Sequence, residues 1–176
     1  MSGHSKWSKI KHKKAATDAE KSRVFSKHAR LIMMESQKAN GDVNSPQLKT
    51  VIEKAKKDNM PQDNIKRAVS KGAGTNVEQI EEVTYEVYGP GGSALIISGV
   101  TDNKNRTAAE IKYILSQKNL SLAQPGAALW AFEKKDGKWE AKTKIHLNDG
   151  DEDTLKDVLD LLEDHVDVKS VYTNVD

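Results

Sequence analysis

The first residues of the chain combine positive charge with an aromatic ring at close spacing. Residues 2–16 hold five lysines between Lys6 and Lys14, together with Trp7. Lysine side chains neutralise phosphates and release counterions, and an indole face stacks on an exposed base. The segment has neither a helical nor an alternating period, so we expect an extended arm. Its candidate nucleic-acid contacts are His4, Lys6, Trp7, Lys9, Lys11, His12, Lys13 and Lys14.

A second interpretation of the same arm stays open. The lysines would then be a solvated basic tail, and Trp7 and Ile10 would pack on the domain that follows. Trp7 can belong to a core even if the lysines bind phosphate. The residues of the arm do not decide between these interpretations.

Charge is segregated along the chain. Residues 1–77 hold 17 Lys and Arg against 7 Asp and Glu, a net charge of +10. Residues 78–176 hold 11 against 19, a net charge of −8, and the last 28 residues hold 2 basic against 10 acidic residues. A polyanion is attracted to the first part and repelled by the second. We therefore expect separate functions for the two parts.

Three amphipathic segments follow the arm, with apolar residues at helical spacing. We expect helices that begin at Thr17 or Asp18, at the capping Ser45 before Pro46, and at Pro61, with Gly72 closing the last. The first should end near Asn40-Gly41. Basic side chains project away from its apolar face, and we take three of them as further nucleic-acid contacts: Arg23, Lys27 and Arg30.

The pattern changes after residue 77. Alternating or continuous apolar runs predict strands at 83–88 and 93–101, a hairpin around Asp136-Gly137, a strand at 142–147 and a closing strand at 168–172. Helices are expected from a cap at Thr107 to Asn119 and over 152–164. This order predicts an α+β fold: a basic three-helix domain over 1–77, then a mostly antiparallel sheet domain over 78–176 with helices on one face.

A polar segment lies between the second strand and the helix that follows it. Asn103, Asn105 and Arg106 are candidate nucleic-acid contacts there, because the amides of a helix N-terminus favour anions. A capped turn with no binding role is the alternative. The Gly89–Gly92 segment reads as a hairpin turn, since it lacks the lysine and the following helix of a phosphate-binding loop.

Other kinds of chemistry find no support in the sequence. There is no cysteine, the five histidines lack metal-ligand spacing, and Asp149, Asp151 and Asp153 begin a calcium-loop pattern that lacks its glycine. We read those aspartates as helix-capping and solvated residues. The sequence predicts no catalytic group, metal or cofactor. Without a membrane-length apolar run or a signal peptide, we expect a cytoplasmic protein.

Four ordered motifs carry a resemblance to a known family. They are Gly3-His4-Ser5-Lys6-Trp7 with Ile10–Ala16, the Tyr88–Gly92 turn, Thr101–Thr107, and the ending from Leu161 to Tyr172. Together they resemble the YebC family of gene-expression regulators, and the likeness runs nearly end to end. The family carries an additional inserted α/β domain before the C-terminal helix, where this chain has about twenty residues. The chain thus resembles a short form of the family.

The resemblance implies a non-enzymatic regulator that binds DNA, as probable transcriptional regulators do, or ribosomal RNA, as translation factors on the ribosome do. We expect a monomer with no membrane partner and no small-molecule substrate. The alternative is a protein–protein interaction adaptor whose lysines only keep it soluble.

Overall fold

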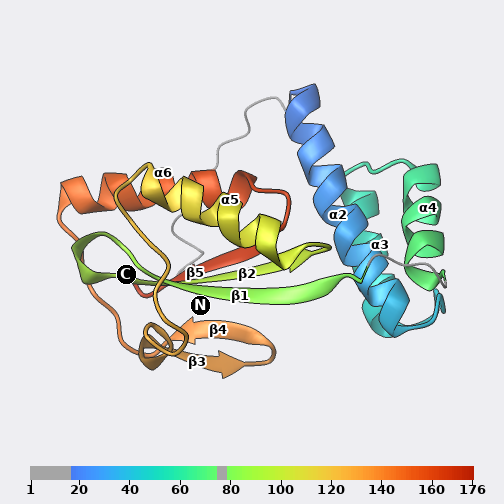
Figure 1. Cartoon of the computed structure of the whole chain (residues 1–176). Helices are drawn as coiled ribbons and strands as arrows, with labels where there is room; N and C mark the ends of the chain where they lie inside the picture. The colour runs from blue at the N-terminus through green and yellow to red at the C-terminus, as the bar shows by residue number, and fades with distance from the viewer. Residues whose placement is uncertain (1–16, 75–78) are drawn as a thin grey trace. The chain divides into compact units, whose positions relative to one another are not determined.

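The computed structural model describes residues 17–74 and 79–176, so every arm candidate from His4 to Lys14 lies outside the described residues. The described chain forms two units (Figure 1). The helical unit comprises the described residues of 17–82 together with Val100–Lys104. The sheet unit comprises Val83–Gly99 and Asn105–Asp176.

The helical unit is built from α2 (Asp18–Lys38), α3 (Pro46–Lys57) and α4 (Gln62–Ala73). Thr17, one of the two expected starts, is the N-cap of α2: its hydroxyl accepts from the Glu20 N–H, and the Glu20 carboxylate accepts from the Thr17 N–H. The three apolar stripes meet in one core. Its fully or largely buried members are Ile32, Leu48, Ala55, Met60, Ile65 and Ala68.

Two local expectations for these helices are wrong. Ser45 precedes α3, but its side chain makes no capping hydrogen bond. Gly72 does not close α4; it lies inside the helix, where α4 packs against α2. A Cβ at position 72 would overlap the Met33 carbonyl oxygen and lie 2.7 Å from the Ser36 Cβ. Glycine is therefore required there by the close approach of two helices.

The main sheet has the strand order β1–β2–β5, formed by β1 (Glu81–Tyr88), β2 (Ala94–Thr101) and β5 (Val168–Thr173). A 3-10 turn, η1 (Pro90–Gly92), joins β1 to β2 at the predicted glycine-rich turn. The β2–β5 pair is antiparallel, with Leu95 opposite Thr173. Helices α5 (Lys104–Ser116) and α6 (Asp149–Asp164) cover one face, as predicted (Figure 1). Their core includes Val87, Leu95, Ile97, Ile111, Leu115, Leu155, Val158 and Leu162.

The opposite face of the sheet packs against a short hairpin. The 3-10 turn η2 (Leu129–Ala131) leads into β3 (Phe132–Lys135), which pairs antiparallel with β4 (Lys138–Ala141) around the predicted Asp-Gly turn. Ala94 and Ile96 of β2 pack with Ala128, Ala131 and Phe132 there.

The strand expected at 142–147 is not formed. Ile145 makes only an isolated parallel bridge with Val175, through an N–H donated to Asn174 at 3.0 Å and a carbonyl accepting from Asp176 at 3.0 Å. Across the described part of the chain, no helix has both the length and the apolar character that a membrane span needs.

Candidate functional site

The helical unit carries a set of exposed lysines on α3 and α4. Lys54, Lys56 and Lys57 occupy the last turns of α3, where the helix dipole favours positive charge, and Lys66 and Lys71 lie on α4. Within 17–74 and 79–176, these five side chains, with Lys21 and Lys49, form no hydrogen bond or ion pair. Positive charge without a protein partner is free to meet an external anion. The sequence patterns of the arm and of α2 do not point to these lysines, which lie between the apolar residues of α3 and α4.

The three candidates on α2 differ from those lysines. Arg30 is largely buried, its side chain 17% exposed, and it pairs with Asp102 at 3.4 Å. This ion pair ties α2 to the 100–104 segment within the same unit. Arg23 and Lys27 also take part in interactions within the fold. All three side chains therefore have structural contacts that a nucleic acid would have to share.

The polar segment at 103–107 is placed differently from the expectation. Helix α5 begins at Lys104, so Asn105 and Arg106 lie in its first turn and Thr107 is not its cap. Asn103 precedes the helix, where its N–H donates to the Thr101 hydroxyl at 2.9 Å. Asn103 and Asn105 are exposed. Thr107 is buried, and its hydroxyl donates to Asp167 at 2.7 Å.

Arg106 also bonds to Asp167. Its Nη2 donates to Oδ2 of Asp167 at 3.0 Å, and the Asp167 side chain is fully buried, while that of Arg106 is 39% exposed. A buried carboxylate needs such donors, because an unsatisfied charge in the interior is costly. The contact gives Arg106 a structural role inside the sheet unit, and a role in nucleic-acid binding stays a prediction.

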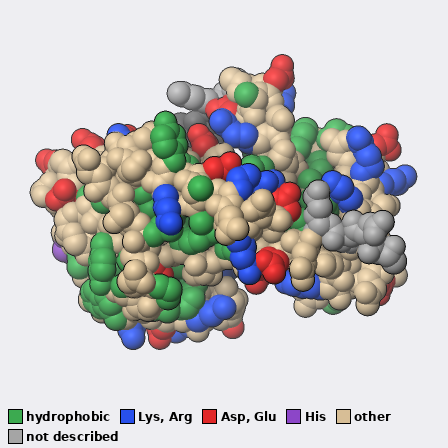
Figure 2. Space-filling view, viewed as in Figure 1, with side chains coloured by type: hydrophobic (Ala, Val, Ile, Leu, Met, Phe, Trp, Pro, Cys, Tyr) green, Lys and Arg blue, Asp and Glu red, His purple; other side chains and the backbone are tan. Residues whose placement is uncertain are grey.

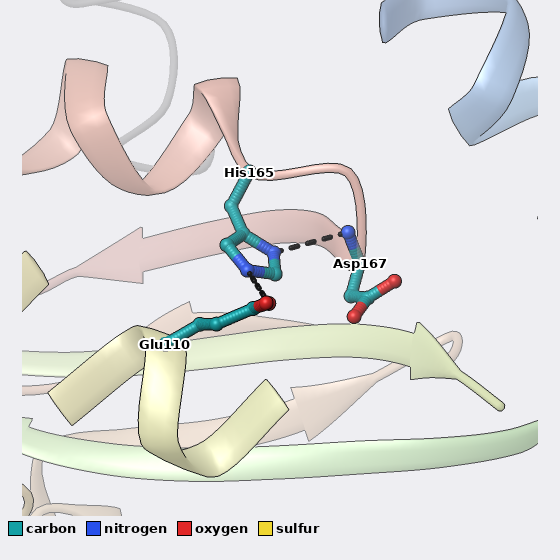
Figure 3. A group of neighbouring side chains, drawn as sticks. All are labelled: Glu110, His165 and Asp167. Carbon is teal, nitrogen blue, oxygen red and sulfur yellow. Dashed lines mark hydrogen bonds and ion pairs between the residues drawn. The ribbon is translucent and has the colours of Figure 1, made fainter. Parts of the chain in front are cut away.

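Glu110 of α5 meets His165 and Asp167, which lie 55 or more residues later in the sequence, beside this contact (Figure 3). Nδ1 of His165 accepts from the Asp167 N–H at 3.1 Å, so its Nε2 is the nitrogen that bonds to the Glu110 carboxylate, at 2.7 Å. Both ring nitrogens are thus engaged. Asp167 already binds Arg106 and Thr107, and a guanidinium beside it opposes a second cation. The arrangement fits a structural hydrogen-bond network better than a metal site.

Glu86 is a buried acidic residue at a position of β1 where the alternating sequence pattern predicts an exposed side chain. It faces the hairpin side of β1, and its carboxylate accepts the N–H groups of Gly126 at 2.6 Å, Ala128 at 2.7 Å and Leu129 at 3.1 Å. The neighbouring Tyr88 hydroxyl donates to the Ala127 carbonyl at 2.6 Å. These bonds fix the segment before η2 to the edge of the sheet. Nothing in the local sequence distinguishes Glu86 from an exposed strand residue.

The acidic C-terminal region forms a charged helix. Helix α6 has eight acidic residues and one lysine, and Asn148 caps it through a side chain that accepts from the Asp151 N–H at 2.9 Å. Asp149 and Asp151 lie in its first turn, so the helix begins three residues before the expected Glu152, and its cap is Asn148 and not one of the aspartates. Further along α6, the Lys118 ammonium donates to the Asp157 carboxylate at 2.7 Å, and this contact lowers the pKa of that carboxyl. The sheet unit thus presents a negative helix surface.

Comparisons with known proteins find similar sequences along most of the chain. Residues 5–75 match the TACO1/YebC protein N-terminal domain, and residues 80–137 match the TACO1/YebC second and third domain. A probable transcriptional regulatory protein of Fervidobacterium nodosum is 46% identical over 157 residues, which are 88% of this chain and 62% of the relative. A protein of the same description from Lactiplantibacillus plantarum is 47% identical over 91% of this chain and 66% of its own length.

A solved structure is also similar. The crystal structure of the conserved hypothetical protein Aq1575 from Aquifex aeolicus superposes with a TM-score of 0.87 at 27% identity, over 98% of this chain and 97% of that one. The chain spans a little under two thirds of the length of the curated relatives described above. The match to the second and third domain stops at residue 137, inside the β3–β4 hairpin.

Proposed function

The chain belongs to the TACO1/YebC family, and from that premise we propose that it is a non-enzymatic regulator of gene expression that binds nucleic acid through its helical unit. The description of its curated relatives as probable transcriptional regulatory proteins supports the regulatory part. The basic surface of the helical unit supports the binding part.

The distribution of charge is the observation that carries the proposal. The lysines of α3 and α4 lack acidic partners within the described residues, whereas α6 is strongly acidic. Phosphate contacts made by such lysines give affinity without reading bases. A nucleic acid would thus meet the helical unit and be repelled by α6.

The proposed target is duplex DNA or structured RNA, with ribosomal RNA and the ribosome as the RNA alternative, in the cytoplasm. The arm lysines would add contacts to those of α3 and α4. Arg23, Lys27, Asn103 and Asn105 remain proposed contacts in addition to this surface. The competing function is a protein–protein adaptor, for which the negative surface of α6 would supply the interface.

Salt dependence of binding tests the proposal. We would measure the affinity of the full chain for a DNA duplex and for an RNA hairpin at several salt concentrations. A variant with Lys54, Lys57, Lys66 and Lys71 changed to glutamine removes up to four phosphate contacts. Its log–log salt slope on duplex DNA should become shallower by up to about 0.9 for each phosphate that the variant no longer neutralises.

A matched control keeps the change in net charge the same. Lys112, Lys138, Lys142 and Lys169 are exposed lysines of the sheet unit, and their change to glutamine should leave the slope nearly unaltered. Equal effects of the two variants would contradict a binding surface on the helical unit. Absence of binding by the wild-type chain to both ligands would favour the adaptor.

A further inference from the structure

A groove with a cavity of about 760 Å³ lies between α2 and α4 of the helical unit. Its apolar lining includes Phe25, Met33 and Met60, of which Met60 is buried and the other two are half-buried. Figure 2 shows hydrophobic surface between these helices, with Lys and Arg side chains beside it. The volume lies in the range of about 300–1,000 Å³ typical of ligand sites.

The exposed charges around the groove are mostly positive. Lys21 of α2 and Arg67 and Lys71 of α4 line it, against one acidic residue, Asp18. Arg67 and Lys71 are four residues apart and lie on the same side of α4. Among the described residues, Lys21 and Lys71 have no ion-pair partner.

The guanidinium of Arg67 is held in position before any ligand arrives. Its Nη2 donates to the Asn64 side-chain oxygen at 2.5 Å, and its Nε donates to the Asp63 carbonyl at 3.4 Å. A planar guanidinium held in this way can stack on a flat ring or bind a phosphate. The groove therefore combines an apolar and aromatic lining with one positioned guanidinium and, at its border, two lysines that are unpaired within the described residues.

We propose that this groove receives an unstacked base of a single-stranded nucleic acid, with the flanking phosphates on Lys21 and Lys71. The inference rests on the proposed function and deepens it, because it adds a site for an unpaired base to the basic surface of the helical unit. Charge complementarity selects this occupant: the apolar lining suits a base, and the border suits phosphates. An apolar protein segment would leave the three cations without partners.

Two single strands of equal charge test the groove. We would compare binding of the full chain to a thymidylate strand of about 12 nucleotides and to an abasic strand of the same length. The thymidylate strand should bind at least about fivefold more tightly, because one stacked base contributes about 1 kcal/mol or more. Phe25→Leu, which keeps an apolar side chain but removes the ring, should reduce this preference. Circular dichroism would verify that the variant is folded.

A pair of lysine variants separates the groove from general electrostatics. The Lys21→Ala/Lys71→Ala variant should weaken thymidylate binding more than Lys49→Ala/Lys56→Ala, whose lysines are equally exposed but lie outside the groove. Equal binding of the two strands, or equal weakening by the two variants, would overturn the base site while leaving the proposed function intact. If the chain bound neither of these strands, nor duplex DNA, nor the RNA hairpin, the proposed function itself would fail.

Discussion

Glu86 holds a loop to the sheet through one buried carboxylate. Because it accepts three backbone N–H groups, Glu86→Ala should leave those donors unsatisfied and lower the free energy of unfolding by at least about 2 kcal/mol. Urea denaturation would measure the loss, and hydrogen exchange should show reduced protection at Gly126, Ala128 and Leu129. Glu133→Ala is the control: the exposed side chain of this strand residue forms an ion pair with Lys135, and its loss should cost about 0.5 kcal/mol or less.

Arg106 is a candidate nucleic-acid contact that also has a clear structural role. Because it donates to the fully buried Asp167, Arg106→Ala should cost about 2 kcal/mol of stability, in the range for hydrogen bonds to charged groups. Lys104→Ala removes a nearby exposed ion pair with Glu81 and should cost about 1 kcal/mol or less. Unchanged stability of Arg106→Ala together with weaker nucleic-acid binding would instead make Arg106 a binding residue.

Tyr85 should make the stability of the sheet unit depend on pH in alkaline solution. Burial, and then the negative charge of Asp167, raise the pKa of Tyr85 above its ordinary value of 10.0. The folded state therefore holds this proton more tightly than the unfolded state. The resulting stability is fully present below about pH 10 and is lost as the pH rises through the folded pKa.

Absorbance of tyrosinate measures this titration directly. Tyr85→Phe should remove from the alkaline tyrosine titration curve the step that Tyr85 contributes. It should also flatten the decline of stability above about pH 10. An unchanged alkaline step would assign the raised pKa to another tyrosine.

Helix packing gives opposite expectations for two helical glycines. A Cβ at Gly72 would collide with the backbone of α2, so Gly72→Ala should destabilise the helical unit by about 1–3 kcal/mol although alanine favours a helix. At Gly150 of α6 an added Cβ would meet only the Asn148 side-chain oxygen, at 3.5 Å. Gly150→Ala should therefore leave the sheet unit equally stable or about 0.5–1 kcal/mol more stable. Thermal melting of both variants compares them, and a stabilised Gly72→Ala would contradict the close packing of α2 and α4.

In the whole molecule, the acidic helix α6 should weaken the binding of polyanions to the basic helical unit. Asp153 and Asp160 are exposed on α6, and changing both to asparagine lowers the repulsion that a nucleic acid experiences. Affinity should rise several-fold at low salt and converge with the wild type as salt increases, since the Debye length falls to about 10 Å at 0.1 M. Filter binding at two salt concentrations measures the effect. A gain that persists at high salt would point to a direct contact instead.

The sequence by itself determined the features that depend on neighbouring residues. The capping box at Thr17, the stripes of α3 and α4, the Asp-Gly hairpin and the order of strands and helices all follow from local spacing and turn chemistry. The charge segregation and the family motifs were equally visible, because they need no knowledge of packing. The α+β fold with helices on one face of its sheet was therefore predictable.

Only the tertiary structure decided which distant residues meet. Glu86 and Leu129, or Arg106 and Asp167, are separated by dozens of residues, and no local pattern marks them as partners. Gly72 looked like a helix end because glycine serves both helix termini and close contacts between helices. The groove between α2 and α4 likewise exists only where two helices pack. Burial and pairing depend on the approach of whole elements, and sequence spacing does not encode that approach.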